Sequence, residues 1–233
     1  MCLANSIGIS SALLLGIALY NTPPSAKDWA PLFAEEGVPQ DWVVRSWDDV
    51  SKPAPPDAVW RVDGSGVLHG SDPRGTWLVS KSEYENFILE FEWKLGERGN
   101  SGCGIRFPGA GDPAFDGLEI QMCDARYNEG RDSDDKLTGS IYKAIAPAKQ
   151  LYKPEAWNHF VITADGMHIT VELNGEKVQD IRLSDFTTSI ERHDGTLAPA
   201  LKERPARGHI GFQELSRGGG HVMIRNARIK VLE

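Results

Sequence analysis

Short runs of apolar or alternating residues, separated by Gly, Pro, Asn and Asp, follow one another from Trp42 to the end of the chain. In residues 89–95 every second side chain is Leu, Phe or Trp, and those between are Glu or Lys. Successive side chains of a strand point to opposite faces, so this run predicts a strand with one buried face. Asn174-Gly175 is typical of a type I′ hairpin turn. Since helical periodicity is nearly absent, we predict an all-β protein with two antiparallel sheets packed face to face.

A chain of 233 residues fits one large sandwich as well as two small domains. No internal repeat or low-complexity stretch divides it, so residues 27–233 are predicted to form a single β-sandwich domain. The predicted strands are residues 59–62, 67–69, 76–80, 87–95, 102–107, 117–123, 141–145, 159–164, 168–173, 176–181, 208–213 and 221–231.

The balance of charges excludes some partners. The chain has a formal net charge of -8 and a sequence pI of about 5.3. Nucleic acids and anionic membranes select basic surfaces, so neither is an expected partner. Neutral ligands stay open, and the oligomeric state is not determined by these features.

The first residues differ from the rest of the chain. Residues 7–20 are apolar and almost uncharged, and turn residues and Ser25-Ala26 follow them. The run is shorter than the roughly 20 apolar residues that span a bilayer. We therefore predict that residues 1–26 are a signal peptide cleaved after Ala26 and that the protein is secreted or periplasmic. Because no Lys or Arg precedes the apolar run, an N-terminal apolar anchor is the alternative.

The most informative strand for function is residues 117–124, Gly-Leu-Glu-Ile-Gln-Met-Cys-Asp. Alternation places Glu119 and Gln121 on one face and Leu118, Ile120 and Met122 on the other. Buried carboxylates and amides cost several kcal/mol unless they are paired. The polar face therefore predicts an open groove for a hydroxyl-rich ligand, with a structural hydrogen-bond network as the alternative.

Several short motifs occur in a specific order along most of the chain, and together they carry a family resemblance. They are residues 29–33, 64–75, 84–89, 100–106, 117–124, Thr138-Gly139-Ser140-Ile141-Tyr142, Trp157-Asn158, Asn174-Gly175, Gly208-His209-Ile210-Gly211-Phe212-Gln213 and 224–229. In this order they resemble the 3-keto-disaccharide hydrolase domain family, formerly a domain of unknown function. The resemblance implies a concanavalin-like jelly-roll fold and a glycoside hydrolase or lyase that acts on 3-keto-glycosides.

The chain departs from that family near its last strand. Relatives commonly read Leu-Gln-x-His-Gly there, whereas Phe212-Gln213 is followed by residues 214–217 and three glycines before His221. The flexible glycines could bring His221 into the place of the family's histidine. His221 is therefore a candidate for binding substrate.

The pattern around Glu119 does not fit an ordinary retaining glycosidase, which needs two carboxylates about 5 Å apart. Position i+4 on the strand is Cys123, and Asp124 points to the opposite face of a regular strand. A 3-keto sugar needs less, because its carbonyl acidifies the C2 proton and allows elimination followed by hydration. Glu119 would then take that proton or protonate the leaving oxygen. Glu119 is the first catalytic candidate.

A cation should neutralise the charge that develops on the carbonyl oxygen, and Arg106 or a bound metal could supply it. A hairpin around residues 108–116 would make Arg106 and Glu119 cross-strand neighbours. A structural salt bridge between them is the alternative. The histidines show no metal-binding spacing, so no cofactor is predicted with certainty and a divalent metal stays open.

Other polar residues suit sugar hydroxyls, with ordinary turn or core hydrogen bonding as the alternative for each. These substrate-binding candidates are Gln121, Asn100, Asp124, Tyr142, Gln213 and His221. Cys103 and Cys123 could form a disulfide or lie on different sheet surfaces as packing residues. The predicted partner is a carbohydrate substrate, and the alternative function is that of a non-catalytic carbohydrate-binding β-sandwich module.

Overall fold

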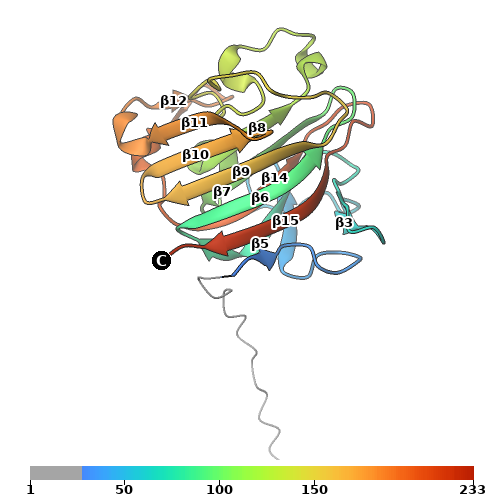
Figure 1. Cartoon of the computed structure of the whole chain (residues 1–233). Coiled ribbons are helices and arrows are strands. Elements are labelled where there is room, and N and C mark those ends of the chain that lie inside the picture. The colour runs from blue at the N-terminus through green and yellow to red at the C-terminus, as the bar shows by residue number, and fades with distance from the viewer. Residues whose placement is uncertain (1–27) are drawn as a thin grey trace, which may run out of the picture.

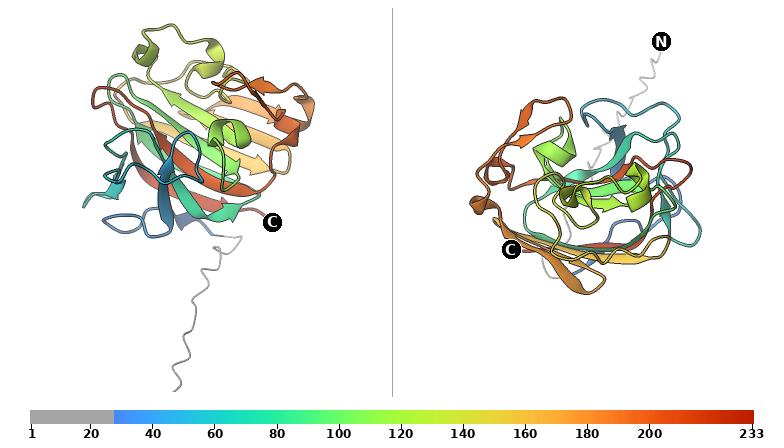
Figure 2. Two further views of the ribbon diagram at one scale, coloured as in Figure 1. Left: turned by 180° about the vertical axis from the view of Figure 1, so that it is seen from behind. Right: turned by 90° about the horizontal axis from the view of Figure 1, so that it is seen from above.

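The computed structural model describes residues 28–233, which form two antiparallel sheets. Figure 1 shows the larger sheet in front and the smaller one behind it, and the view from above in Figure 2 shows them as two layers. The eight-stranded sheet has the order β11-β10-β9-β6-β15-β4-β3, and β1 also pairs with β15. Its strands are β1 (Ala30–Pro31), β3 (Arg61–Val62), β4 (Leu68–His69), β6 (Phe87–Lys94), β9 (Asn158–Asp165), β10 (His168–Leu173), β11 (Glu176–Arg182) and β15 (Met223–Val231).

The five-stranded sheet has the order β2-β5-β14-β7-β8. Its strands are β2 (Trp42–Ser46), β5 (Thr76–Tyr84), β7 (Asn100–Phe107), β8 (Leu118–Cys123) and β14 (Gly208–Glu214). A small separate ribbon pairs β12 (Ile190–Glu191) with β13 (Leu197–Ala198). Short helices lie in the connections: α1 (Pro113–Asp116), η1 (Ala125–Asn128), η2 (Asp134–Lys136), η3 (Leu183–Asp185) and η4 (Leu201–Glu203).

The core lies between the two sheets and is built from alternating side chains. In β6 every second residue is buried, as its sequence predicts. Phe91 of that strand contacts Phe212 of β14 across the sandwich, with ring centroids 5.2 Å apart in an edge-to-face arrangement. Both residues belong to one apolar cluster that draws on both sheets. The predicted two-sheet antiparallel sandwich is confirmed.

Local predictions were confirmed in one turn and wrong in another segment. Asn174 and Gly175 both have positive φ and connect β10 to β11, as a type I′ turn requires. Residues 141–145 do not form a strand but a tight turn, in which Ile141 pairs in isolated bridges with Ile120 and Ile145. The apolar Ile141 is buried by this turn, which explains its strand-like sequence.

The two described cysteines are both free and buried. Cys103 belongs to the core between the sheets, and Cys123 lies opposite Asn100 on the neighbouring strand. None of the helices in residues 28–233 has the length and apolar character that crossing a bilayer requires. The predicted signal peptide lies outside the described residues, so its cleavage and the export of the protein stay predictions.

Candidate active site

Strand β8 carries Glu119 on the outer face of the five-stranded sheet. The even-numbered residues of this strand follow the sequence prediction, since Leu118, Ile120 and Met122 all enter the core. Glu119 lies opposite Gly104 in the β7–β8 ladder, next to the pair of Gly102 and Gln121. A Cβ on Gly102 would lie 1.9 Å from Glu119 Oε1, so the glutamate occupies the space that this glycine leaves free.

A small cavity of about 30 Å³ lies beside Glu119. It has room for a water molecule or for one substituent of a sugar ring, but not for a whole pyranose. The groove expected to hold the ligand is therefore a narrow cavity, and the body of a ligand would lie outside its mouth. The lining residues come from strands β7, β8 and β14, helix α1 and the connections: Trp47, Asn100, Asp112, Ala114, Glu119, Gln121, Tyr142, His193, Gln213 and Leu215.

The Glu119 carboxyl group has no cation beside it among these lining residues. The residue is only 2% exposed, and its Oε1 atom is buried without a hydrogen-bond partner. Burial raises the pKa of Glu119 well above its ordinary value, and the carboxylate of Asp112 adds to the rise. Burial therefore favours the protonated form of Glu119, which can donate its proton to a bound oxygen.

Asp112 is the second carboxyl group at the cavity, and it begins helix α1. Its Oδ1 atom accepts a hydrogen bond from the backbone N–H of Ala114 at 3.0 Å, as an N-cap does. Burial raises the pKa of Asp112 to about 7; the Ala114 N–H opposes that rise and Asp116 adds to it. Burial thus raises the pKa of both carboxyl groups, and only Asp112 has a backbone donor that opposes the rise.

Three side chains fix the position of α1. The backbone N–H of Asp112 donates to Asp116 Oδ2 at 2.9 Å, and Arg192 forms an ion pair with the same Asp116. Buried Arg204 donates to the carbonyl oxygens of Ala114 and Gly117, at 3.2 and 2.7 Å. These contacts hold Asp112 at the cavity from outside the sheet.

Aromatic side chains form the remaining wall and the mouth. The Tyr142 hydroxyl lies 3.4 Å from His193 Nε2, and both rings contact Phe115 of α1. Burial, followed by the nearby Glu119 carboxylate, raises the pKa of Tyr142, while burial and Lys143 lower the pKa of His193. Both groups are therefore neutral at pH 7 and can act as hydrogen-bond partners. Trp47, at the mouth, is 38% exposed.

The structure brings most of the predicted residues together. Asn100, Gln121, Tyr142 and Gln213 line the same cavity as Glu119. The Gln121 amide donates to Asn100 Oδ1 at 3.4 Å, so these two amides also contact each other. These four candidates therefore lie at one cavity with Glu119, while their roles in binding sugar stay predictions.

Arg106 is not part of this site, so the prediction that it faces Glu119 is wrong. Its guanidinium donates to the carbonyl oxygens of Glu85 and Gly166, at 2.7 and 2.6 Å, and to the side chain of Asn86. The cause is a register shift where β7 pairs with β14, together with a φ of 53° at Arg106. The shift breaks the alternation, and Arg106 ties together the turns at one end of the sandwich.

Asp124 and His221 also lie outside the cavity lining, contrary to the prediction. The Asp124 carboxylate accepts two hydrogen bonds of 2.8 Å from Arg126 and caps η1, so it has a structural role. His221 Nδ1 lies 3.6 Å from the buried Glu214 carboxylate, which itself accepts the backbone N–H of Val222. His221 therefore belongs to the loop before β15.

Sequence reasoning missed the other three polar or aromatic residues of the cavity: Trp47, Asp112 and His193. Each lies in a connection distant from β8 in the sequence, where no periodic pattern marks a face. The Asp-Pro pair at 112–113 is a helix-start signal that could have drawn attention to Asp112. No comparable local signal marks Trp47 or His193.

A metal ion has no evident set of ligands here. Residues 28–233 contain no group of three or more His, Cys, Asp or Glu side chains that could hold one. A divalent ion, which the sequence left open, is therefore not assigned to this site.

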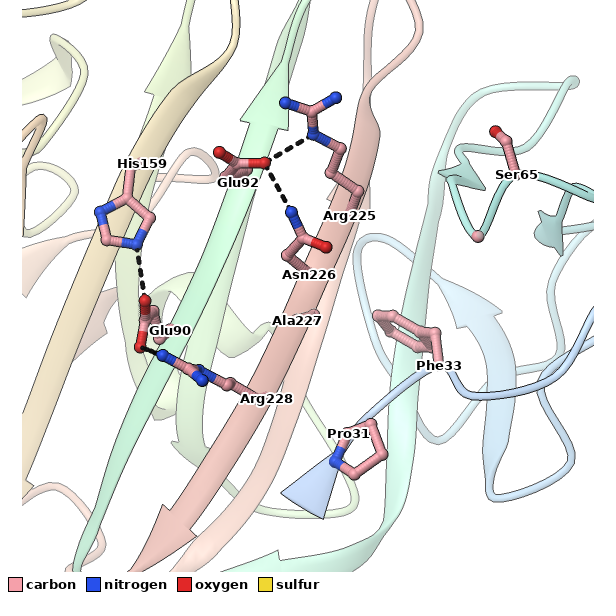
Figure 3. A pocket seen from close by; sticks show the side chains of 11 residues that line it. Pro31, Phe33, Ser65, Glu90, Glu92, His159, Arg225, Asn226, Ala227 and Arg228 are labelled. Atoms are coloured by element: carbon pink, nitrogen blue, oxygen red, sulfur yellow. Dashed lines mark hydrogen bonds and ion pairs between the residues drawn. The ribbon is translucent and has the colours of Figure 1, made fainter. Parts of the chain in front are cut away.

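A larger groove of about 600 Å³ lies on the outer face of the other sheet (Figure 3). Glu90 accepts hydrogen bonds from Arg228 at 2.8 Å and pairs with His159 at 3.0 Å. Glu92 accepts from Arg225 at 2.5 Å and from Asn226 at 2.8 Å. Each carboxylate in this groove thus has a cation beside it, and the groove offers no unpaired acid or base.

The antiparallel sandwich, with a polar site on the outer face of its smaller sheet, defines the molecule as a jelly-roll protein of the concanavalin-like class. A family model described as the 3-keto-alpha-glucoside-1,2-lyase-like domain matches residues 28–230, and the chain belongs to this family. The resemblance predicted from the sequence motifs is confirmed.

Individual relatives agree with this assignment. The chain is 24% identical over 225 residues to the 3-keto-disaccharide hydrolase of Bacteroides thetaiotaomicron, covering 86% of this chain and 73% of the relative. A crystal structure of a candidate glycosyl hydrolase from Parabacteroides distasonis superposes with a TM-score of 0.70 at 28% identity, covering 88% of this chain and all of that one. A second one from the same organism gives a TM-score of 0.66 at 24% identity, over 89% and 95% of the two chains, and supports the fold.

Proposed function

We propose that this protein is a glycosidase-type enzyme that cleaves 3-keto-glycosides, with Glu119 as an acid in its active site. The observation that carries the proposal is the buried Glu119 carboxyl group, which has an oxygen without a partner at a cavity lined by three amides and the Tyr142 hydroxyl. A buried polar group without a partner costs stability, so its presence favours a function that uses it. The family and the names of two relatives support a glycoside as the substrate.

The chemistry follows from the protonation state of Glu119. A carboxylic acid that keeps its proton at neutral pH can donate it to the glycosidic oxygen as the bond to C1 breaks. The amides of Asn100, Gln121 and Gln213 can hold ring hydroxyl groups at the mouth of the cavity. Trp47, exposed beside them, offers an apolar surface for one face of the sugar ring.

The 3-keto group explains how cleavage can proceed without a second carboxylate on strand β8. Strand β8 has no second carboxylate at position i+4, so a glycosyl-enzyme intermediate formed from this strand has no nucleophile. A carbonyl at C3 makes the C2 proton acidic and lets the leaving group depart by elimination. Water then adds to C1, and the overall reaction is hydrolysis.

The test is turnover by the mature protein on a panel of glycosides and their 3-keto derivatives, with and without a chelator. We expect release of the aglycone from at least one 3-keto-glycoside and much slower release from its parent. Glu119→Gln should abolish turnover and still bind the substrate. Sugar binding by the wild type without turnover of any compound would instead favour a carbohydrate-binding module.

We also propose that the protein is exported, because of the apolar segment and the small residues before Lys27. Expression of the full chain in a bacterial host with a periplasm should yield a mature form that begins at Lys27, as measured by mass spectrometry of the intact protein. An uncleaved chain in the membrane fraction would support the anchor instead.

A further inference from the structure

We propose that Asp112 is a second catalytic residue of this site, the base that removes the C2 proton of a 3-keto-glycoside while Glu119 protonates the leaving oxygen. The inference rests on the proposed function and adds the partner that strand β8 does not contain. Nothing in the alternation of the strands indicates it, because Asp112 enters from the connection between β7 and β8.

The geometry of the cavity is the first argument. Asp112 and Glu119 line the same space of about 30 Å³, which is small enough for both carboxyl groups to reach a ligand inserted there. One oxygen of Asp112 accepts the Ala114 N–H, and this fixes the direction of the carboxylate. Glu119 Oε1 is buried and has no partner, so a ligand atom at this position would supply one.

The charges around the pair are the second argument. None of the lining residues is Lys or Arg, so nothing inside the cavity neutralises two carboxylates together. The charged groups that act on Asp112 are Asp116 and Asp48, which raise its pKa, and Arg192, which lowers it; Arg192 is already paired with Asp116. Two acids in such a place share their protons unequally, as in other pairs that divide the acid and base roles.

The direction of this division is set by burial. Glu119 is 2% exposed and its Oε1 atom has no donor, and burial raises its pKa well above the ordinary value. Asp112 accepts the Ala114 N–H, a contact that favours its charged form and opposes the rise of its pKa, so Asp112 is assigned the role of the ionised group that accepts a proton. Tyr142 and His193, the other titratable residues that line the cavity, are neutral at pH 7 and complete its wall.

The proposed steps balance. The Asp112 carboxylate takes the proton from C2, the C2–H electrons form the C1–C2 double bond, the C1–O bond breaks, and Glu119 gives its proton to the leaving oxygen. In the hydration step the Glu119 carboxylate takes a proton from water as the water oxygen bonds to C1. Asp112 then returns its proton to C2, so both groups are restored and the net reaction consumes one water.

The test separates proton removal from departure of the leaving group. A 3-keto-glycoside is incubated in D₂O, and C2 deuteration of the unreacted substrate and release of the aglycone are followed by NMR. Glu119→Gln should keep C2 exchange above the uncatalysed rate and lose aglycone release by about 10³-fold. Asp112→Asn should lose both by about 10²-fold or more, in line with the usual contribution of a general base.

Matched controls address folding. Asn is as good an N-cap as Asp, so Asp112→Asn should keep α1 and melt at or above the wild-type temperature. Asp194→Asn removes an exposed carboxylate from the loop beside His193, outside the cavity lining, and should exchange and react like the wild type.

The outcomes are distinguishable. A folded Asp112→Asn variant that exchanges and reacts at the wild-type rate overturns the role of Asp112 but leaves the proposed function intact. Absence of turnover by the wild type on every 3-keto-glycoside contradicts the proposed function itself, and the inference falls with it.

Discussion

Glutamates stand on the outer faces of both sheets, but their surroundings differ. On the eight-stranded sheet, Glu90 and Glu92 are partly exposed, and each lies in hydrogen-bond contact with an arginine (Figure 3). On the five-stranded sheet, Glu119 is buried beside Asp112, and the lining of their cavity contains no basic side chain except the neutral His193. The larger groove therefore has the more complete ion pairing, and the smaller cavity holds the acid without a partner.

The pKa directions express the same difference. Partial burial acts to raise the pKa of Glu90, but hydrogen bonds from Arg228 and His159 leave it below its ordinary value. Burial raises the pKa of Glu119, and no cation compensates. A partly exposed acid that is paired with a cation stays ionised, whereas a buried acid without a partner has a raised pKa, as catalytic acids often do. In the proposed function, the active site is therefore the smaller cavity and not the groove with the larger volume.

The largest expected effect concerns the acid itself. Glu119→Gln should reduce turnover of a 3-keto-glycoside by about 10³-fold, because the amide cannot give a proton to the leaving oxygen. Glu92→Gln removes a carboxylate of the other sheet and should leave the rate within about twofold. Steady-state kinetics on both variants measure the contrast. A larger loss in Glu92→Gln than in Glu119→Gln would move the active site to the groove of Figure 3.

The space that Gly102 leaves free beside Glu119 allows a second test of the difference between the two regions. In Gly102→Ala the new methyl group would lie 1.9 Å from the present position of Glu119 Oε1, so the carboxyl group must turn away. We expect a loss of about 10²-fold in turnover and of about 1–3 kcal/mol in the free energy of unfolding, as for other overpacked sites.

Gly64→Ala is the matched control, because a Cβ there would meet its nearest neighbour, Glu36, at an ordinary 3.7 Å. This variant should keep its activity. Full activity in Gly102→Ala would show that the observed position of Glu119 is not required for catalysis. Kinetics and urea unfolding of both variants provide the readout.

Stability should depend on pH with opposite signs in the two regions. The folded chain keeps the Glu119 proton above the ordinary value of 4.5, while the unfolded chain loses it. Wild-type stability should therefore fall relative to Glu119→Gln as pH rises from 4.5 towards 7, by at most about 1.4 kcal/mol per pH unit. Urea unfolding at pH 4.5, 5.5 and 7 measures the difference. A difference that does not grow with pH would show that Glu119 is ionised in the folded state.

The smallest effect is expected at Glu90. Because its folded pKa is lowered, the wild type should be more stable than Glu90→Gln at neutral pH and should lose this advantage as pH falls through the folded pKa. The side chain is 22% exposed and its partners are more so, so the advantage should be about 1 kcal/mol or less and should shrink in high salt. An advantage of several kcal/mol would mean that the ion pairs of this face are a major source of stability.

Much of the architecture could be predicted from local patterns. Alternation in β6 and β8 identified which side chains enter the core, and Asn174-Gly175 identified its hairpin. The same alternation placed Glu119 and Gln121 on one outer face. It was wrong in residues 141–145, where an apolar residue is buried by a turn, and such burial looks the same as a short strand in the sequence.

Alternation also fails for Arg106, since a bulge turns this residue away from the face that its position predicts. Three further residues show what packing alone can place. Trp47, Asp112 and His193 belong to connections far apart in the sequence, yet they enclose one cavity with Glu119. Contacts between distant segments produce this arrangement, such as the hydrogen bond from Arg204 to the Gly117 carbonyl oxygen at the end of α1.

The amino-acid order by itself determined the sandwich, the face on which Glu119 lies and the membership of a family. The sandwich and the face of Glu119 follow from local backbone geometry, because the side chains of a strand alternate whatever surrounds it. The tertiary structure alone decided that Asp112 joins Glu119 and that Arg106 does not. Distances between segments, and the burial that shifts a pKa, depend on how loops pack on the sheet, and no repeat in the sequence encodes that packing.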